Sequence, residues 1–454
     1  MLKTLRNSIL TGTILSPLLF APNVAFAQNN SNEHKFFIPR SATLFSARFA
    51  NDPIGRVDIA ENFNADTLVW HYPSIGPNFN TGTIDETNAR LNPDTINAAL
   101  PAFTRVAANS CLTSSGATIP HGSLNPQIFY PDTQNAAFRQ EVEVFLNNAH
   151  NAGVTSFQQD DPAFMVSRMS QGCYQNTPLS TVESYVDNYY TWLLDKIEVI
   201  FGETVPITYN KRASSGATYT RLAPNFNAAM SEIDQDENTP EKLYDLIHIE
   251  NDIGDASTTG LNLTTITTLV DNSRLRNRRH LSAVYALGGH MIAPYDVYIP
   301  PVNNVSQPRF FGNPADYAPY YGMVRDNADI FDGYWINDVY IDHYQNSSGN
   351  ILKNGKLKGV SSRHNVMGIL KQNAAGGRVL HVVNWQVSRA NMTNGSHFFT
   401  FWIDKSSIPF VPNHVEIRRP GKPNLIKPVT DGGFNRWKVT VSGVDVWAVA
   451  EFKE

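Results

Sequence analysis

Residues 154–162 read Val-Thr-Ser-Phe-Gln-Gln-Asp-Asp-Pro, a run that changes from apolar to acidic just before a proline. A helical pattern over residues 135–152 precedes it, with Asp132 placed to cap that helix and Gly153 placed to end it. A helix followed by a glycine and a short strand is typical of βα units, in which helices pack on a parallel sheet. This stretch therefore predicts an α/β fold.

The same alternation of short apolar runs and longer helical ones extends from about residue 55 to residue 345. Strands are predicted at residues 67–72, 105–111, 154–160, 205–210, 243–250, 281–287 and 291–298, and further helices at 179–201, 264–275 and 314–328. Seven strands favour a (β/α)8 TIM-like barrel over a smaller nucleotide-binding sheet. No G-x-G-x-x-G or G-x-x-x-x-G-K-S/T segment follows any of them, which argues against a nucleotide site.

The sequence pattern changes after about residue 350. Residues 366–371, 378–385, 398–403, 414–418, 437–441 and 446–452 alternate or run apolar between Gly, Asn and Pro, without a helical period. This pattern predicts an antiparallel β-sandwich domain. The expected organisation is a signal peptide at 1–27, a barrel domain at 28–350 and a β-sandwich domain at 351–454.

Composition and charge exclude several classes of protein. Of the 454 residues, 42% are hydrophobic and only 17% are charged, so the chain is expected to fold around a large core. The 36 basic and 41 acidic residues give a formal charge of -5, and no basic run occurs along the chain. Such a chain has no field that would attract nucleic acid or an anionic membrane.

The N-terminus has the features of an export signal. Lys3 and Arg6 precede a mostly apolar stretch at residues 9–20, and Ala-Phe-Ala at residues 25–27 forms a small-x-small cleavage site. No later segment is long and apolar enough to cross a bilayer. The mature protein is therefore expected to be secreted or periplasmic.

The chain has two cysteines, Cys111 and Cys173. In an oxidising compartment such a pair is free to form a disulfide, which we expect here. They lie too far apart in the sequence for a zinc-finger site, and no histidine lies at matching spacing.

Asp160 and Asp161 are the first candidate catalytic residues. The active sites of βα barrels lie where the strands end, because the last inward side chains and the following loops converge there. If Phe157 faces the outer helices, the two-residue period of a strand turns Gln158 and Asp160 toward the barrel axis. The structural alternative is that Asp161 caps the next turn while Asp160 pairs with an arginine.

Glu250 is the second candidate. Ile247 and Ile249 alternate with His248 and Glu250 in the predicted strand 243–250, so the polar pair would face the axis. Glu250 would then act as a nucleophile, acid or base, supported by His248. The alternative is a polar pair buried in the barrel interior without a catalytic role.

A third group of residues is suited to binding sugar. Aromatic rings stack on the C–H faces of a sugar ring, and carboxylates accept hydrogen bonds from its hydroxyls. The candidates flank predicted strand ends or the following loops: His71, Tyr72, Asn210, His290, Tyr295, Asp296 and Arg309. Their alternative is a solvated rim of strand ends.

These stretches resemble a known family. Residues 66–72 (DTLVWHY), 157–162 (FQQDDP) and 286–298 (ALGGHMIAPYDVY), followed by a β-sandwich, resemble the barrel glycoside hydrolases distantly related to the β-galactosidase and agarase groups. The resemblance covers roughly residues 55 to 450. Members of that clan carry an Asn-Glu pair after the fourth strand and a Glu after the seventh. This chain has Asp160 and Asp161 at the first place and no glutamate near Asp296 at the second.

The function predicted from these observations is that of an exported glycoside hydrolase that cleaves a poly- or oligosaccharide without a cofactor. Two carboxylates would act across the bond, Asp160 and Glu250, with Asp161 and Asp296 as alternatives or sugar-binding groups. Gln158 and His248 would assist in binding. A barrel without catalysis that binds carbohydrate is the second interpretation. A third is a metal-dependent hydrolase or lyase in which these carboxylates hold a hard cation.

Overall fold

The structure is a computed structural model. It describes residues 41–44, 67–70, 97–100, 104, 106–119, 129–151, 156–159, 162–203, 205, 207–211, 221–226, 228–234, 236, 239–254, 261–268, 274–294, 316–331, 333–341, 357–359, 366–385 and 397–454.

Eight parallel strands form the first sheet. They are β1 (Ser41–Leu44), β2 (Thr67–Trp70), β3 (Asn97–Leu100), β4 (Ser156–Gln159), β5 (Ile207–Lys211), β6 (Ala228–Asp234), β7 (Leu261–Thr268) and β8 (His290–Pro294). Their order is β2-β1-β8-β7-β6-β5-β4-β3, and β2 and β3 at its two ends also contact each other. Each strand therefore lies beside its neighbours in the sequence and β8 lies beside β1, which is the strand order of a (β/α)8 barrel.

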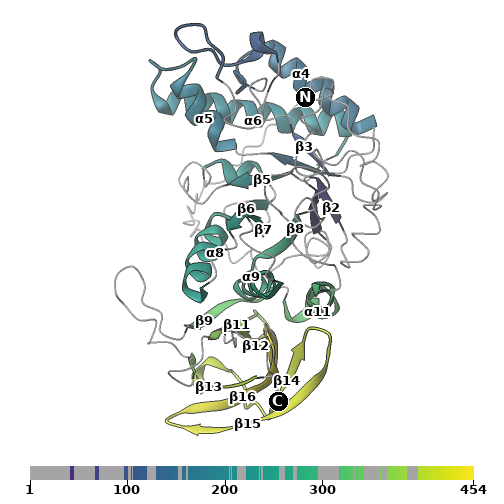
Figure 1. Ribbon diagram of the computed structural model, residues 1–454, viewed down its shortest axis with the longest axis vertical. Coiled ribbons are helices and arrows are strands. Elements are labelled where there is room, and N and C mark those ends of the chain that lie inside the picture. The colour runs from purple at the N-terminus through teal and green to yellow at the C-terminus, as the bar shows by residue number, and fades with distance from the viewer. Residues whose placement is uncertain are drawn as a thin grey trace, which may run out of the picture.

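Helices cover this sheet from outside (Figure 1). They are α4 (Ala136–Asn151), α5 (Pro162–Gln171), α6 (Leu179–Phe201), α8 (Pro240–Gly254), α9 (Arg274–Leu287) and α11 (Ala318–Asp326). Short 3-10 turns also occur, namely η4 (Ala107–Asn109), η6 (Ala223–Asn225), η8 (Ala328–Ile330) and, in the C-terminal sheet, η9 (Lys405–Ser407). The predicted helix at 179–201 is confirmed. Its buried residues recur every three or four positions, which is the spacing of one helix face.

The predicted disulfide is confirmed. Cys111 and Cys173 are bonded, with their Cα atoms 5.2 Å apart and a sequence separation of 62. The bond ties the segment after η4 to the connection between α5 and α6.

Three predicted strands and one predicted helix are wrong. Residues 243–250 belong to α8 and residues 281–287 to α9, while residues 105–111 hold η4 and isolated bridges rather than a barrel strand. Residues 279–287 are all buried, because α9 lies between the barrel strands and the C-terminal sheet. A helix buried on every side loses its periodic pattern and looks like a buried strand. Of the predicted helix at 264–275, residues 264–268 belong to β7 and residues 274 and 275 begin α9.

The C-terminal sheet has nine antiparallel strands. They are β9 (Trp335–Ile341), β10 (Leu357–Gly359), β11 (Val366–Gln372), β12 (Arg378–Asn384), β13 (His397–Asp404), β14 (His414–Arg419), β15 (Lys422–Gly433), β16 (Arg436–Val444) and β17 (Trp447–Lys453). Their order is β10-β13-β16-β15-β14-β17-β12-β11-β9, so β9, which precedes residue 351, belongs to this sheet.

This sheet curls around its own apolar core. The long strand β15 pairs with β14 through its first half and with β16 through its second half. The edge strands also meet, since the backbone N–H of Leu357 on β10 donates to the carboxylate of Asp338 on β9 at 2.5 Å. The expected sandwich is therefore one curled antiparallel sheet.

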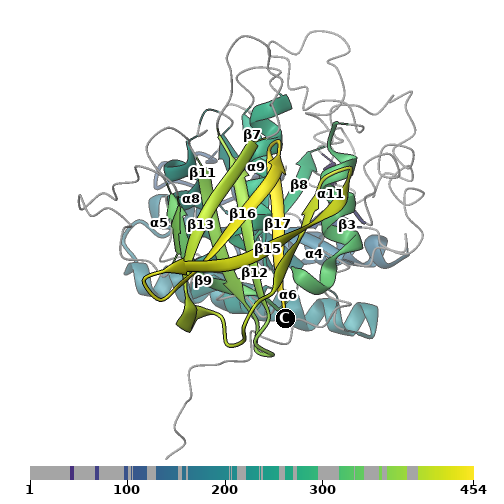
Figure 2. The same cartoon turned by 90° about the horizontal axis from the view of Figure 1, so that it is seen from below.

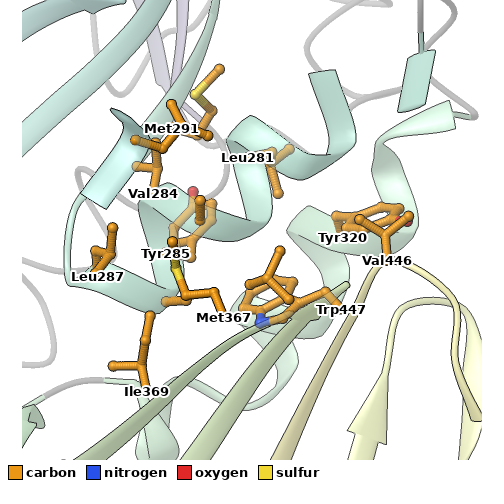
Figure 3. Close-up of a cluster of buried hydrophobic side chains, with 14 of the residues drawn as sticks. Leu281, Val284, Tyr285, Leu287, Met291, Tyr320, Met367, Ile369, Val446 and Trp447 are labelled. Carbon is orange, nitrogen blue, oxygen red and sulfur yellow. The ribbon is translucent and has the colours of Figure 1, made fainter. Parts of the chain in front are cut away.

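The outer face of β11, β12 and β17 packs against α9 and α11 (Figure 3). The rings of Tyr285 and Trp447 are stacked with centroids 6.2 Å apart, and Met367 and Ile369 of β11 face the same cluster. The guanidinium of Arg279 donates to the backbone carbonyl of Trp385 at 3.0 Å. The barrel and the C-terminal sheet thus share one continuous core.

Candidate active site

The outward faces of β4 and β5 are identified by their packing. The rings of Phe157 on β4 and Phe201 on α6 pack edge to face, with centroids 5.5 Å apart. The ring centroids of Tyr209 on β5 and Phe226 are 4.7 Å apart. Phe157 thus faces the helices, which is the condition on which the inward placement of Gln158 and Asp160 is based. Because neighbouring residues of a strand alternate between its faces, the intervening positions belong to the face toward the barrel axis.

Two of the predicted binding residues lie on these strands. Gln158 is on β4 opposite Thr208, and Asn210 is on β5 opposite Met230, one residue before the end of the strand. Both positions alternate with the outward residues. They therefore keep their place among the candidates for substrate binding.

Several predicted site residues lie outside the described residues: Asp160, Asp161, His71, Tyr72, Tyr295, Asp296 and Arg309. In the sequence, Asp160 directly follows the last residue of β4, His71 that of β2 and Tyr295 that of β8. Their assignment to the active face stays a prediction.

The placement of His248 and Glu250 on an inward-facing strand is wrong. Both lie in α8, which follows β6 and precedes β7. A crossover helix between parallel strands runs back toward the N-terminal end of the next strand, so its last turns lie away from the active face. The catalytic role predicted for Glu250 loses its geometric basis.

His290 is also at the wrong end of its strand. It is the first residue of β8, is 5% exposed, and its ring lies 6.0 Å from the ring of Tyr285 on α9. Active-site residues of a barrel come from the C-terminal ends of the strands. His290 therefore belongs to the packing below the site rather than to the sugar-binding rim.

Glu232 is the candidate that the sequence reasoning missed. It lies two residues before the end of β6 and is half-buried. Its neighbour Ile233 packs in the cluster with Leu243 and Ile247 of α8, so Ile233 faces outward. The alternation of the strand then turns Glu232 toward the barrel axis at the C-terminal end. Asp234, the last residue of β6, shares this face and is exposed.

A weak signal for β6 is present in the sequence. Met230, Glu232 and Asp234 alternate with Ala229, Ser231 and Ile233, which is a strand period ending in two acidic residues. The run holds few β-branched or aromatic residues, so its strand propensity is low.

His280 of α9 supports the end of β6 from the helical layer. The ring is fully buried, its Nδ1 lies 2.8 Å from the backbone carbonyl oxygen of Arg276, and the carbonyl of Asp234 faces the same ring. Burial lowers the pKa of His280 to about 4 and outweighs the two carbonyls, which favour the charged form. A neutral imidazole therefore packs behind the candidate site.

Among the residues that the structure describes, no group of three or more His, Cys, Asp and Glu side chains is arranged to hold a metal ion. The helices in the described ranges include none that is long and apolar enough to span a membrane.

Solved structures share this architecture. Amy13B from Eubacterium rectale is 10% identical with a TM-score of 0.54 over 92% of this chain and 96% of its own. A GH27 β-L-arabinopyranosidase from Geobacillus stearothermophilus is 8% identical with a TM-score of 0.51 over 93% and 98%. An isomaltodextranase from Arthrobacter globiformis, solved with panose, is 11% identical with a TM-score of 0.51 over 93% and 73%.

The likeness at this identity concerns the fold. The chain has the fold of the barrel glycoside hydrolases, as the resemblance in its sequence predicted. No family model matches the sequence, and no curated protein matches it.

Proposed function

We propose that this protein is an exported glycoside hydrolase that cleaves O-glycosidic bonds of a poly- or oligosaccharide with two carboxyl groups. One is Asp160 or Asp161, which follow β4 in the sequence, and the other is Glu232 of β6. The observation that carries the proposal is the place of Glu232, an axis-facing, half-buried carboxylate near the C-terminal end of a barrel strand.

Strand order supports this pairing. β5 lies between β4 and β6, so carboxyl groups at the ends of β4 and β6 would stand on either side of one strand. Glycoside cleavage needs carboxyl groups about 5 Å apart for retention of configuration and about 6.5 to 9.5 Å apart for inversion. Adjacent strands are about 4.8 Å apart, so β4 and β6, with β5 between them, are separated by about 10 Å. Side chains that point inward from both strands bring their carboxyl groups closer together than that.

The chemistry divides into two roles. One carboxylic acid protonates the leaving glycosidic oxygen, while the other carboxylate attacks the anomeric carbon or activates water. Asn210, between the two on β5, would hydrogen-bond sugar hydroxyls. Tyr295 and Asp296 after β8, with His71 and Tyr72 after β2, would complete the rim by stacking and hydrogen bonding.

Substitution of Glu232 tests the proposal. Glu232→Gln keeps the shape of the side chain but removes its titratable proton, so sugar release should fall at least a hundredfold, in line with acid–base contributions of about 10² to 10⁴. The readout is reducing-end release from a panel of plant, algal and bacterial polysaccharides. Asp160→Asn and Asp161→Asn identify the partner in the same assay.

Glu250→Gln is the matched control, since Glu250 lies on α8 away from the active face. It should leave sugar release within about twofold of the parent protein. Normal sugar release by Glu232→Gln, or a large loss in Glu250→Gln, would contradict the assignment. If no polysaccharide in the panel is cleaved but some are bound, the protein is a carbohydrate-binding barrel.

A further inference from the structure

One half of the C-terminal sheet turns a face away from the barrel. It consists of β10, β13, β16 and the end of β15. Strands β13, β15 and β16 lie at the far end of the molecule in Figure 1 and cross the front of Figure 2. On β13, Phe399, Phe401 and Ile403 are buried in the core of the curled sheet. Phe398 and Trp402 alternate with them and belong to the outer face.

Trp402 lies against the backbone of this outer face. It is half-buried and pairs across the strands with Lys438, which pairs in turn with Thr430 of β15. A β-carbon added to Gly432 would come within 2.7 Å of the indole Cδ1. The missing side chain at Gly432 therefore makes room for the indole on the surface of β15, with part of the ring open to solvent.

The surroundings of Trp402 are polar but carry little net charge. The hydroxyls of Thr400 and Thr440 lie 3.0 Å apart. Arg436 donates to Asp404 at 2.9 Å on the same pair of strands. At the edge of the sheet, Lys405 donates to Asp431 at 2.8 Å. Paired charges cancel at a distance, and the lysines that neighbour Trp402 across the strands, Lys358 on β10 and Lys438 on β16, add two positive charges to this face. Two positive charges make a weak field for a polyanion, so the face mainly presents hydrogen-bonding groups.

A second aromatic residue follows Gly432 by two positions in the sequence. Phe434, in the turn between β15 and β16, is 100% exposed and has a φ of 50°, and Asn435 follows with a φ of 60°. Positive φ is unusual for a bulky residue and costs conformational free energy. A turn of this kind would be more stable with Asn or Gly at the first place. The strained backbone thus holds an apolar ring in water.

We propose that this outer face binds a neutral polysaccharide chain, with the Trp402 indole as the stacking surface and the Phe434 ring as a second contact. An open aromatic ring among hydroxyls and paired charges matches the alternating C–H faces and hydroxyls of a sugar polymer. The core of a protein interface is depleted of Lys, Asp and Ser, which argues against a protein partner. The choice of ligand rests on the proposed function, because a polymer is long enough to contact a site remote from the barrel opening.

Affinity gel electrophoresis of the full chain tests this proposal. The gels contain soluble starch, dextran, arabinoxylan or galactan, and all proteins carry Glu232→Gln so that hydrolysis does not alter the gel. At least one polysaccharide should retard the protein. Trp402→Ala should weaken that retardation about tenfold, since a stacked aromatic contact contributes about 1 to 1.5 kcal/mol. Gly432→Ala should act in the same direction by displacing the indole.

Trp192→Ala is the matched control, because Trp192 is a half-buried tryptophan of α6 in the helical layer of the barrel, where the guanidinium of Arg139 lies 5.2 Å from its ring. It should leave retardation unchanged. The proposal is overturned if no polysaccharide retards the protein, if the Trp402 and Trp192 variants lose retardation equally, or if Trp402→Ala instead converts a dimer to a monomer in light scattering. Retardation that depends on Trp402 supports the proposal even if the parent protein releases no sugar.

Discussion

Ile233 and Ile247 pack in the same apolar cluster between β6, α8 and α9. Their shared packing shows which of the two glutamates, Glu232 or Glu250, faces the barrel axis. Glu232 precedes Ile233 on a strand, where successive side chains point to opposite faces. Glu250 belongs to the helix that carries Ile247. The alternation of apolar and polar residues at 247–250 resembles that of a strand, but it extends over four residues only. One apolar contact therefore separates the glutamate of the candidate site from the glutamate of the helical layer.

The buried neutral His280 predicts a loss of stability in acid. Its pKa is about 4 in the folded protein and about 6.5 when unfolded, so the unfolded chain takes up the proton first as the pH falls. The stability associated with neutral His280 is fully present above pH 6.5. As the pH falls from about 6.5 to about 4, protonation of this histidine lowers the free energy of unfolding by about 3 kcal/mol.

Urea unfolding at several pH values measures this effect, with His280→Gln as the comparison. The variant should show a shallower dependence of unfolding free energy on pH across this window. Some dependence should remain, because His381 is also fully buried and its pKa is also lowered. Identical pH profiles for the parent and the variant would show that His280 titrates normally in the folded state.

At the scale of elements, α9 has the position that most constrains the molecule. It follows β7 and packs on the barrel with one side and on β11, β12 and β17 with the other. Arg279 and Lys371 add polar contacts across the second boundary, the latter through its ammonium and the backbone carbonyl of Tyr285 at 3.5 Å. A helix held from both sides has little room to repack after a substitution.

Leu281→Ala should therefore lower the free energy of unfolding by about 2 to 5 kcal/mol, the range for a fully buried leucine that leaves a cavity. Val199→Ala on α6 is the control, because Val199 is 77% exposed and should change stability by less than about 0.5 kcal/mol. Thermal unfolding of both variants gives the comparison. An equal, small effect in both would mean that α9 is packed less tightly than its burial indicates.

At the scale of the whole molecule, the barrel and the C-terminal sheet are joined through a shared core rather than through a linker alone. Tyr285, Leu281 and Val284 of α9 and Tyr320 of α11 meet Trp447 and Met367 of the sheet in one cluster (Figure 3). Each large apolar side chain buried there contributes about 1.5 to 3 kcal/mol.

A chain ending at residue 334, before β9, should expose the apolar side of α9 and α11 and should aggregate or unfold without cooperativity. Size-exclusion chromatography with light scattering, together with sugar release, compares it with the full chain. A soluble, active, monomeric fragment would show that the sheet is dispensable for the barrel.

The sequence by itself determined the parts of the fold whose burial is one-sided. The helix at 179–201, most C-terminal strands and the βα alternation follow from periodic patterns, because one face of each element meets water and the other meets the core. The disulfide follows from the cysteine count and the expected oxidising compartment. The sequence also predicts chemistry at Asp160 and Asp161, which follow β4 in the sequence. Only the tertiary structure decided that α9 is a helix, since burial on both sides erases periodicity. The same holds for β6 and its Glu232: weak strand propensity hides that strand until β5 and β7 pair with it, and only the packing of Ile233 shows which face carries the carboxylate.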